Sequence, residues 1–277
     1  MSTDSSPRSV FIISDGTGIT AETLAHSLLS QFDGLTYRQI RMPFVDSADK
    51  VTECIARIDE ARHREGQLPI IVSTLVNADN AARIAACDAV VLDFFAAFIA
   101  PLEDALGRRA SHSIGRGHGD ASSSAYAARI EAVNFTLAHD DGVSDANLDA
   151  SDVILVGVSR SGKTPTSLYL ALQFGLRVAN YPLIPEDFER GRLPVALNAH
   201  RAKLFGLTIN PDRLASIRRE RRPDSRYAAL ENCRWEIEQA HRLMRREGIR
   251  CLDSTTKSIE EISATLMLTL CLEPRTR

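Results

Sequence analysis

The sequence has little cysteine and no long apolar run, and each absence excludes a class of protein. Its five cysteines are scattered over 277 residues without a C-x-x-C pair, which disfavours both a disulfide scaffold and a zinc site. No apolar run approaches the ~20 residues of a membrane-spanning helix, and the N-terminus lacks the basic and apolar regions of a signal peptide. We therefore expect a cytoplasmic protein that does not bind membranes.

The charge balance and the aromatic content exclude further partners. With 33 basic and 36 acidic residues the net charge is -3, so the chain as a whole does not attract nucleic acid or an anionic membrane. Trp235 is the only tryptophan, and the other aromatic residues are too scattered to stack bases. Hydrophobic residues make up 44% and charged residues 25%, which is typical of a globular chain long enough for two modest domains.

The first half of the sequence alternates short apolar runs with segments of helical periodicity. Strands are expected at residues 10–14, 36–45, 68–76 and 89–94, and helices at residues 20–32, 47–66 and 77–88. In the second of these helices, apolar residues recur at three-to-four spacing from Val51 to Ala61, and Gly66 ends the segment. Such regular alternation predicts a parallel α/β sheet.

The composition changes after residue 106. Residues 107–125 are rich in Gly, Ser, His and Arg and predict a flexible segment. Beyond it we expect a helix at 125–142 and a second series of strands at 153–156, 177–183, 203–209 and 249–254. The prediction is two α/β domains with mainly parallel sheets: residues 1–145, which include the flexible segment, and residues 146–277, a P-loop kinase-like domain.

The segment GVSRSGKT fits the phosphate-binding pattern G-x-x-x-x-G-K-[ST] at every position. The predicted nucleotide-binding residues are Gly157, Val158, Ser159, Arg160, Ser161, Gly162, Lys163 and Thr164. An apolar run precedes the segment and helix formers follow it, which is the strand, loop and helix context that the motif needs. Backbone N–H groups of the loop would hold a di- or triphosphate. Lys163 would reach the outer phosphates, and the Thr164 hydroxyl would bind a magnesium ion.

Two features beside this loop modify the interpretation. Pro165 has no N–H group, so it removes a donor that would often face the inner phosphate of a nucleotide. Further along, arginines cluster at Arg213, Arg218, Arg219, Arg221, Arg222 and Arg226. Such a cluster is either a solvated helix face or a lid that neutralises transferring phosphates, and the sequence leaves both open.

Several acidic residues could transfer a proton or bind magnesium. Asp140 and Asp141 follow a predicted helix, and they are either catalytic carboxylates or part of a solvated turn. Asp93 imitates the end of a Walker B strand but precedes the phosphate-binding loop, whereas Asp253 ends a strand in the second domain. The segment Asp15–Gly18 follows the first strand and is either a tight turn or an anion site.

Three classes of protein could use such a phosphate site. A GTPase would need the guanine-specifying N-K-x-D after the loop, which is absent. A small-molecule kinase of the nucleoside-monophosphate or shikimate type fits the second half, but such kinases place the loop at the N-terminus, whereas about 150 residues precede it here. In a protein-directed kinase or regulator, those residues would help to recognise the partner.

Longer blocks of sequence narrow this choice. They are ISDGTGITAE, FTLAHDDG, ILVGVSRSGKTPTSLYLA, ANYPLI, KLFGLTINPDRLASIRRERR, SRYA and STTKSIEEIS. On these blocks the chain resembles the bifunctional kinase/pyrophosphorylase family, whose bacterial members regulate phosphoenolpyruvate synthase or pyruvate, phosphate dikinase. The resemblance spans nearly the whole chain, is weakest over about residues 47–130, and favours the synthase as the target.

The resemblance implies a protein kinase that uses ADP to phosphorylate a threonine of phosphoenolpyruvate synthase and so inactivates it. It also implies the reverse reaction, in which inorganic phosphate removes the phosphoryl group and pyrophosphate is released. On this basis Lys163 and magnesium bound to Thr164 would polarise the β-phosphoryl group of ADP, and Asp140 or Asp141 would orient or deprotonate the threonine. A homodimer is the expected assembly.

Overall fold

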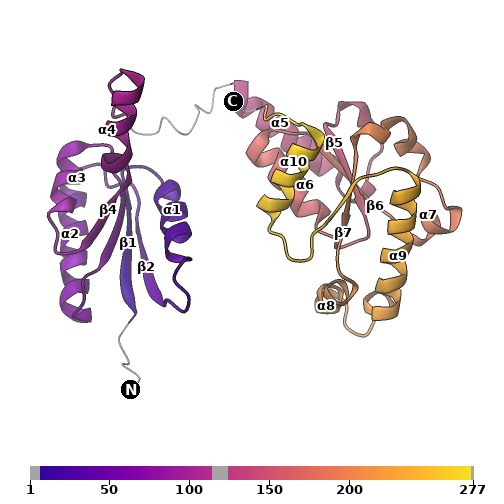
Figure 1. Cartoon of the computed structure of the whole chain (residues 1–277), viewed down its shortest axis with the longest axis horizontal. Helices are drawn as coiled ribbons and strands as arrows, with labels where there is room; N and C mark the ends of the chain where they lie inside the picture. The colour runs from indigo at the N-terminus through magenta and orange to yellow at the C-terminus, as the bar shows by residue number, and fades with distance from the viewer. Residues whose placement is uncertain (1–6, 114–123, 276–277) are drawn as a thin grey trace. The chain divides into compact units, whose positions relative to one another are not determined.

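The structure, a computed structural model, describes residues 7–113 and 124–275. The chain divides into two compact units, Met1–His118 and Gly119–Arg277, and each has its own four-stranded sheet (Figure 1). All the strand pairs of both sheets are parallel. The predicted fold class, two α/β domains with parallel sheets, is confirmed.

The sheet of the first unit has the strand order β2-β1-β3-β4. Its elements are β1 (Arg8–Ser14), α1 (Ile19–Leu29), β2 (Tyr37–Met42), α2 (Ala48–Glu65), β3 (Ile70–Thr74), α3 (Ala78–Ala85), β4 (Val90–Asp93) and α4 (Phe94–Leu106). Residues of β1 alternate between two apolar clusters, because successive side chains of a strand point to opposite faces. Phe11 and Ile13 pack with residues of α2, whereas Val10 and Ile12 pack with residues of α1. Helices therefore cover both faces, as a parallel sheet requires.

Helix α2 begins and ends at the residues that cap it. The Ser47 side chain accepts a hydrogen bond from the backbone N–H of Lys50, and Gly66 follows the last turn with a φ of 65°. A left-handed residue at this place ends a helix, and glycine adopts that conformation without strain. The helix predicted from apolar spacing and from Gly66 is confirmed.

Helix α4 has no counterpart among the predicted elements. It begins after Asp93, whose side chain accepts a hydrogen bond from the N–H of Ala96, and it contains Pro101. No residue of α4 is buried, and Leu102 and Leu106 are more than half exposed. A proline inside a segment argues against a helix there, so Pro101 explains why the sequence does not predict α4.

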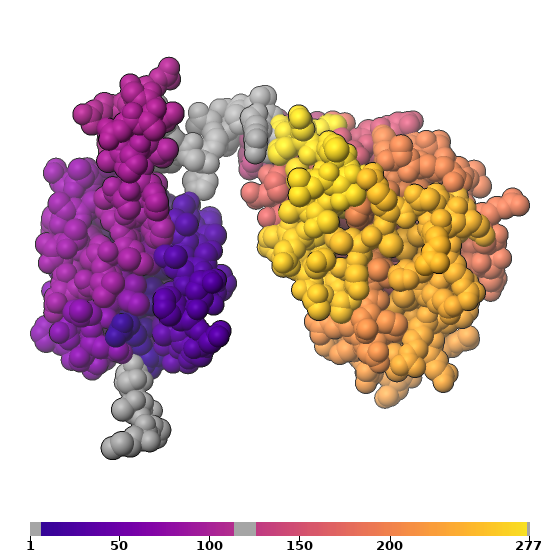
Figure 2. Space-filling model, in the orientation of Figure 1, coloured from indigo at the N-terminus to yellow at the C-terminus, as the bar shows by residue number. Residues whose placement is uncertain are grey.

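The sheet of the second unit has the order β6-β5-β7-β8. Its strands are β5 (Val153–Gly157), β6 (Val178–Pro182), β7 (Leu204–Thr208) and β8 (Cys251–Asp253). Its α-helices are α5 (Ser124–Ala138), α6 (Lys163–Phe174), α7 (Pro185–Arg190), α8 (Pro211–Arg221), α9 (Leu230–Arg246) and α10 (Ile259–Leu270), and the short 3-10 helices are η1 (Asp140–Gly142), η2 (Leu148–Ala150), η3 (Val195–Lys203) and η4 (Arg226–Ala228). Residues from α6 and α10 cover one face of the sheet, and residues from α7, α8 and α9 cover the other. Figure 2 shows α9 and α10, in orange and yellow, forming much of the visible surface of this unit.

Helix α5 belongs to the second unit, so the boundary between the units differs from the expected one at residue 145. The Thr136 side chain accepts a hydrogen bond of 3.1 Å from the N–H of Val178 in β6, and the His139 carbonyl accepts one of 3.0 Å from the N–H of Asn180. These contacts join the end of α5 to the edge strand of the second sheet. The predicted flexible segment, residues 107–125, lies mostly outside the described residues.

Both units share one topology, which indicates where a ligand site is expected. In each, the first strand lies between the second and the third, so the connection after the first strand leads to one side of the sheet and the connection after the third leads to the other. Open α/β sheets bind ligands at such a switch point. The turn Asp15–Gly18 occupies this place in the first unit, and the loop Gly157–Gly162 occupies it in the second.

Candidate functional site

The loop between β5 and α6 has a backbone that only certain residues allow. A Cβ atom built on Gly157 would lie 2.1 Å from the carbonyl oxygen of Leu207, so no larger residue fits there. Arg160 and Gly162 have left-handed φ values of 73° and 92°. The loop thus turns sharply out of the sheet and delivers Lys163 to the first position of α6.

Lys163 is 3% exposed, although a lysine is rarely so deeply buried. Its Nζ atom donates a hydrogen bond of 3.0 Å to the carbonyl of Val158 at the start of the loop. Burial lowers the pKa of this ammonium group to about 8, against the opposing effect of the carboxylates of Asp141 and Asp140. Burial removes the water that would stabilise the charged ammonium group. An anionic ligand bound beside Lys163 would stabilise that charge in place of water.

The two predicted catalytic carboxylates differ in their surroundings. The Thr164 hydroxyl donates a hydrogen bond of 2.9 Å to Oδ1 of Asp140, and the Asn180 amide donates to the same oxygen. Asn180 in turn accepts a hydrogen bond of 3.1 Å from the N–H of Asp141. The Asp141 carboxylate has no hydrogen bond or ion pair with any described residue. Asp140 is therefore held beside Thr164, whereas the Asp141 carboxylate acts on Lys163 through its charge.

The loop and Asp141 border a cavity of about 230 Å³, which we call the phosphate cavity. It is lined by Asp141, Ser159, Arg160, Gly162, Lys163, Thr164, Pro165, Ile217 and Arg221. Pockets for whole drug-sized ligands are larger, about 300–1,000 Å³, so this cavity suits the phosphoryl part of a nucleotide. The structure brings most of the predicted loop residues together with one of the predicted carboxylates, and it adds Ile217 and Arg221 from α8.

The arginine cluster separates into two kinds of residue. Arg218 is fully buried, forms an ion pair of 2.7 Å with Glu236, and donates hydrogen bonds of 3.1 Å to the carbonyls of Ser159 and Tyr227. The interpretation of the whole cluster as a lid or a solvated face is wrong for Arg218, which ties α8 and α9 to the loop. Arg221, by contrast, is exposed, lines the phosphate cavity and has no ion pair among the described residues.

The other acidic candidates hold backbone segments in place. Asp15 accepts a hydrogen bond of 2.6 Å from the N–H of Val76, and Asp93 caps α4. Asp253 accepts one of 2.8 Å from the N–H of Thr255. None of the three lines the cavity beside Lys163.

Sequence reasoning missed Asn180, which positions Asp140 and Asp141. It lies in the block ANYPLI, but its contact with Asp140 joins residues 40 positions apart, and no local pattern marks such a pair. His139 has a similar supporting role. Its two ring nitrogens lie 2.7 Å from the carbonyl oxygens of Phe135 and Ala146, so the ring fixes the turn that carries the carboxylates.

The donor set beside the loop fits a magnesium ion. No group of three or more His, Cys, Asp or Glu side chains lies together in the part of the chain that the structure describes. Magnesium rarely needs one, because it binds through one or two protein oxygens, the phosphates of its nucleotide and water. The Thr164 hydroxyl and the Asp140 carboxylate, in direct contact, offer such oxygens. Over residues 7–113 and 124–275, no helix has the length and apolar character that a bilayer span requires.

The parallel sheets and the glycine-rich loop leading into α6 define an α/β protein with a kinase-like second unit. The model of the kinase/pyrophosphorylase family matches residues 10–267. The chain therefore belongs to the kinase/pyrophosphorylase family, and membership indicates a kinase or phosphotransferase activity.

Curated relatives match this chain over most of their length. The chain is 63% identical over 265 residues to a protein of Aromatoleum aromaticum named "Putative phosphoenolpyruvate synthase regulatory protein", covering 95% of this chain and 96% of the relative. Proteins of the same name from an Azoarcus species and from Cupriavidus metallidurans are 62% and 60% identical. The match covers 94% of this chain in both cases, and 94% and 96% of the two relatives.

Proposed function

We propose that the chain regulates phosphoenolpyruvate synthase by moving a phosphoryl group to and from a threonine of that enzyme. In the forward direction ADP is the donor, and the modified synthase is inactive. In the reverse direction inorganic phosphate is the acceptor, and pyrophosphate leaves. The names of the relatives support the target, and the contact of Thr164 with Asp140 is the structural observation that carries the site, because it joins the predicted carboxylates to the loop.

In the forward reaction, the threonine oxygen attacks the β-phosphorus of ADP. A bond forms between them, the bond from that phosphorus to the bridging oxygen breaks, and AMP leaves with the electron pair. Backbone N–H groups of residues 157–164 hold the phosphates, and Lys163 neutralises the charge that develops on them. Arg221 lines the same cavity from α8 and adds a second positive charge. Magnesium bound at Thr164 and Asp140 would supply further charge neutralisation.

The surroundings of the two carboxylates divide their roles. Asp140 is fixed by Thr164 and Asn180, so we assign it to the metal side of the site. The Asp141 carboxylate accepts no hydrogen bond from the described residues and lines the phosphate cavity beside Lys163, so we assign it as the base that takes the threonine proton. In the reverse reaction a phosphate oxygen attacks the phosphothreonine, the bond from phosphorus to the threonine oxygen breaks, and Asp141 returns the proton to that oxygen.

Isotope transfer tests this function directly. The purified chain is incubated with phosphoenolpyruvate synthase and either ADP labelled in its β-phosphate or ATP labelled in its γ-phosphate. We expect label on a threonine of the synthase from ADP, and release of that label as pyrophosphate when inorganic phosphate is added. Transfer from ATP and none from ADP would contradict the proposed donor, and phosphorylation of small molecules alone would favour a small-molecule kinase.

A further inference from the structure

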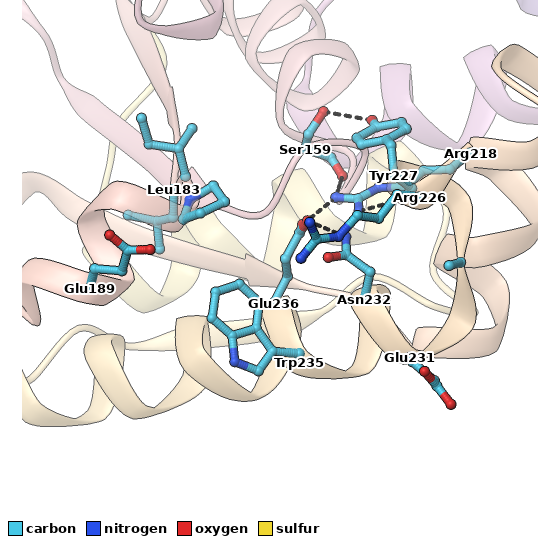
Figure 3. A pocket seen from close by; sticks show the side chains of 13 residues that line it. Ser159, Leu183, Glu189, Arg218, Arg226, Tyr227, Glu231, Asn232, Trp235 and Glu236 are labelled. Carbon is cyan, nitrogen blue, oxygen red and sulfur yellow. Dashed lines mark hydrogen bonds and ion pairs between the residues drawn. The ribbon is translucent and has the colours of Figure 1, made fainter.

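A second and larger hollow adjoins the phosphate cavity. Its volume is about 860 Å³, and it lies between the segment that follows β6 and the first turns of α9 (Figure 3). Ser159 lines both spaces, so the hollow opens beside the phosphate-binding loop. A group bound there would reach the phosphoryl group without crossing the sheet.

The wall shared by the two spaces is held in place by a polar network. The Ser159 hydroxyl lies 3.0 Å from the Tyr227 hydroxyl, and the Ser159 carbonyl accepts from Arg218. The Arg218 guanidinium lies 4.1 Å from the centre of the Tyr227 ring. In Figure 3 these side chains stand together on one side of the hollow, with Glu236 and Asn232 beneath them. One polar atom of this wall, Nε of Arg218, is buried and has no hydrogen-bond partner among the described residues.

The opposite wall is mainly apolar, with Glu189 beside Leu183 (Figure 3). Leu183, Ile184 and Pro185 line it from the end of β6, and Trp235 rises toward them from α9. Trp235 is 41% exposed, and its ring and that of Phe188 pack edge to face with ring centres 5.7 Å apart. A half-exposed tryptophan beside an apolar wall is the composition of a binding hot spot.

The charges of the hollow favour a polypeptide over a further phosphate group. Glu236 neutralises Arg218, and the remaining charged residues of the lining are Glu189, Glu231 and Arg226, which sum to -1. Neither Glu189 nor Glu231 has an ion pair with any described residue. An anion would be repelled by this rim, whereas a segment with a basic side chain would be attracted.

We propose that this hollow receives the segment of the protein substrate that carries the accepting threonine. An apolar side chain of the segment packs on Trp235, a basic side chain meets Glu189, and the threonine hydroxyl points past Ser159 toward the phosphoryl group. This inference rests on the proposed function, because it assumes that the acceptor is a protein.

Steady-state kinetics with intact synthase test the proposal. Trp235→Ala should raise the KM for the synthase about tenfold or more, and Glu189→Lys about threefold or more, with the KM for ADP within about twofold of the wild type. Glu260→Lys is the matched control, because Glu260 is an exposed glutamate of α10 outside the hollow with no ion pair among the described residues, and it should change neither constant. Glu189 is exposed on α7, so its variant remains informative if Trp235→Ala fails to fold.

The outcomes separate this proposal from the proposed function. If the wild type transfers label and both variants keep the KM for the synthase, the segment binds elsewhere and the inference is overturned. If the KM for ADP rises instead, the hollow holds the nucleoside. Absence of transfer by the wild type would instead count against the proposed function.

Fluorescence tests binding without catalysis, because Trp235 is the only tryptophan of the chain. The probe is a tryptophan-free synthetic peptide that spans the threonine labelled in the synthase. We expect the peptide to shift Trp235 emission to shorter wavelength, and ADP alone to leave it unchanged. A shift by ADP that the peptide reverses, or no shift by the peptide, would overturn the proposal.

Discussion

Lys163 is a buried cation beside the phosphate cavity, and the proposed function gives its charge a role in phosphoryl transfer. The variant Lys163→Met keeps most of the side-chain volume and removes the charge. Loss of one preorganised charge at a phosphoryl group should lower the rate of transfer about 10²–10³-fold. Thermal stability should be unchanged or higher, because the free energy cost of burying the ammonium group is removed.

Phosphoryl transfer to the synthase and thermal unfolding measure these two effects. Lys50→Met is the control, since Lys50 is exposed and pairs with Asp46 in the first unit. Full kinase activity of Lys163→Met would contradict the role of the lysine.

The pKa of Lys163, lowered to about 8, predicts how ADP affinity depends on pH. Below pH 8 the free protein already carries the charge that the phosphates need. Above pH 8 the free lysine loses its proton, whereas phosphates raise the pKa in the complex, so binding must take up a proton. The affinity should therefore fall as pH rises, by up to about tenfold per unit above 8. Titration calorimetry in magnesium-free buffers of different ionisation enthalpy measures both the affinity and the proton uptake; an affinity independent of pH from 7 to 9.5 would contradict it.

The two carboxylates beside the loop should respond differently to removal of their charge. Asp141→Asn should lower the rate of transfer about 10²–10⁴-fold with little change in ADP affinity, because it removes the proposed base. Asp140→Asn should raise the magnesium concentration needed for half-maximal activity, because it removes the proposed metal ligand.

Asp145→Asn is the matched control for both, since Asp145 is an exposed carboxylate a few residues away and outside the phosphate cavity. Activity is measured against magnesium concentration for the three variants. Equal effects of Asp140→Asn and Asp141→Asn on the magnesium requirement would argue against the division of roles.

Strand β7 packs so closely on α9 that one of its positions admits only glycine. A Cβ atom on Gly206 would lie 2.3 Å from Sδ of Met244 and 2.8 Å from Cβ of Cys251. Gly206→Ala should therefore lower the free energy of unfolding of the second unit by about 1–3 kcal/mol. Denaturant unfolding checks this, with Gly16→Ala as control, because the nearest atom to its added methyl group is 3.8 Å away. An unfolding midpoint equal to that of the wild type would show that the contact relaxes freely.

Elements with a clear local signal could be predicted from the sequence, and those determined by distant contacts could not. Most strands coincide with apolar runs of the sequence, and the caps of α2 are visible as Ser47 and Gly66. Helix α5 has the pattern of a helix, but its assignment to the second unit depends on hydrogen bonds to β6 that no local pattern encodes. The same holds for the site. The loop is a continuous motif that the sequence shows directly. The contact of Asn180 with Asp140 and the ion pair of Arg218 with Glu236 join residues far apart in the sequence, so they exist only in the folded chain.

At the scale of the whole molecule, the phosphate site belongs to one unit. All the residues that line the phosphate cavity lie between Asp141 and Arg221, and the second unit has its own apolar cores on both faces of its sheet. A fragment of residues 119–277 should therefore fold cooperatively and bind ADP with a Kd within about threefold of that of the full chain. Circular dichroism during unfolding and titration calorimetry with ADP measure the two properties.

A shorter fragment of residues 146–277, which is the second domain as the sequence alone divides the chain, lacks α5 and both carboxylates. It should unfold at lower temperature, because the β6 edge loses the hydrogen bonds of Thr136 and His139. A fragment of residues 119–277 that folds cooperatively but binds ADP more than tenfold more weakly would contradict the assignment of the nucleotide site to this unit alone.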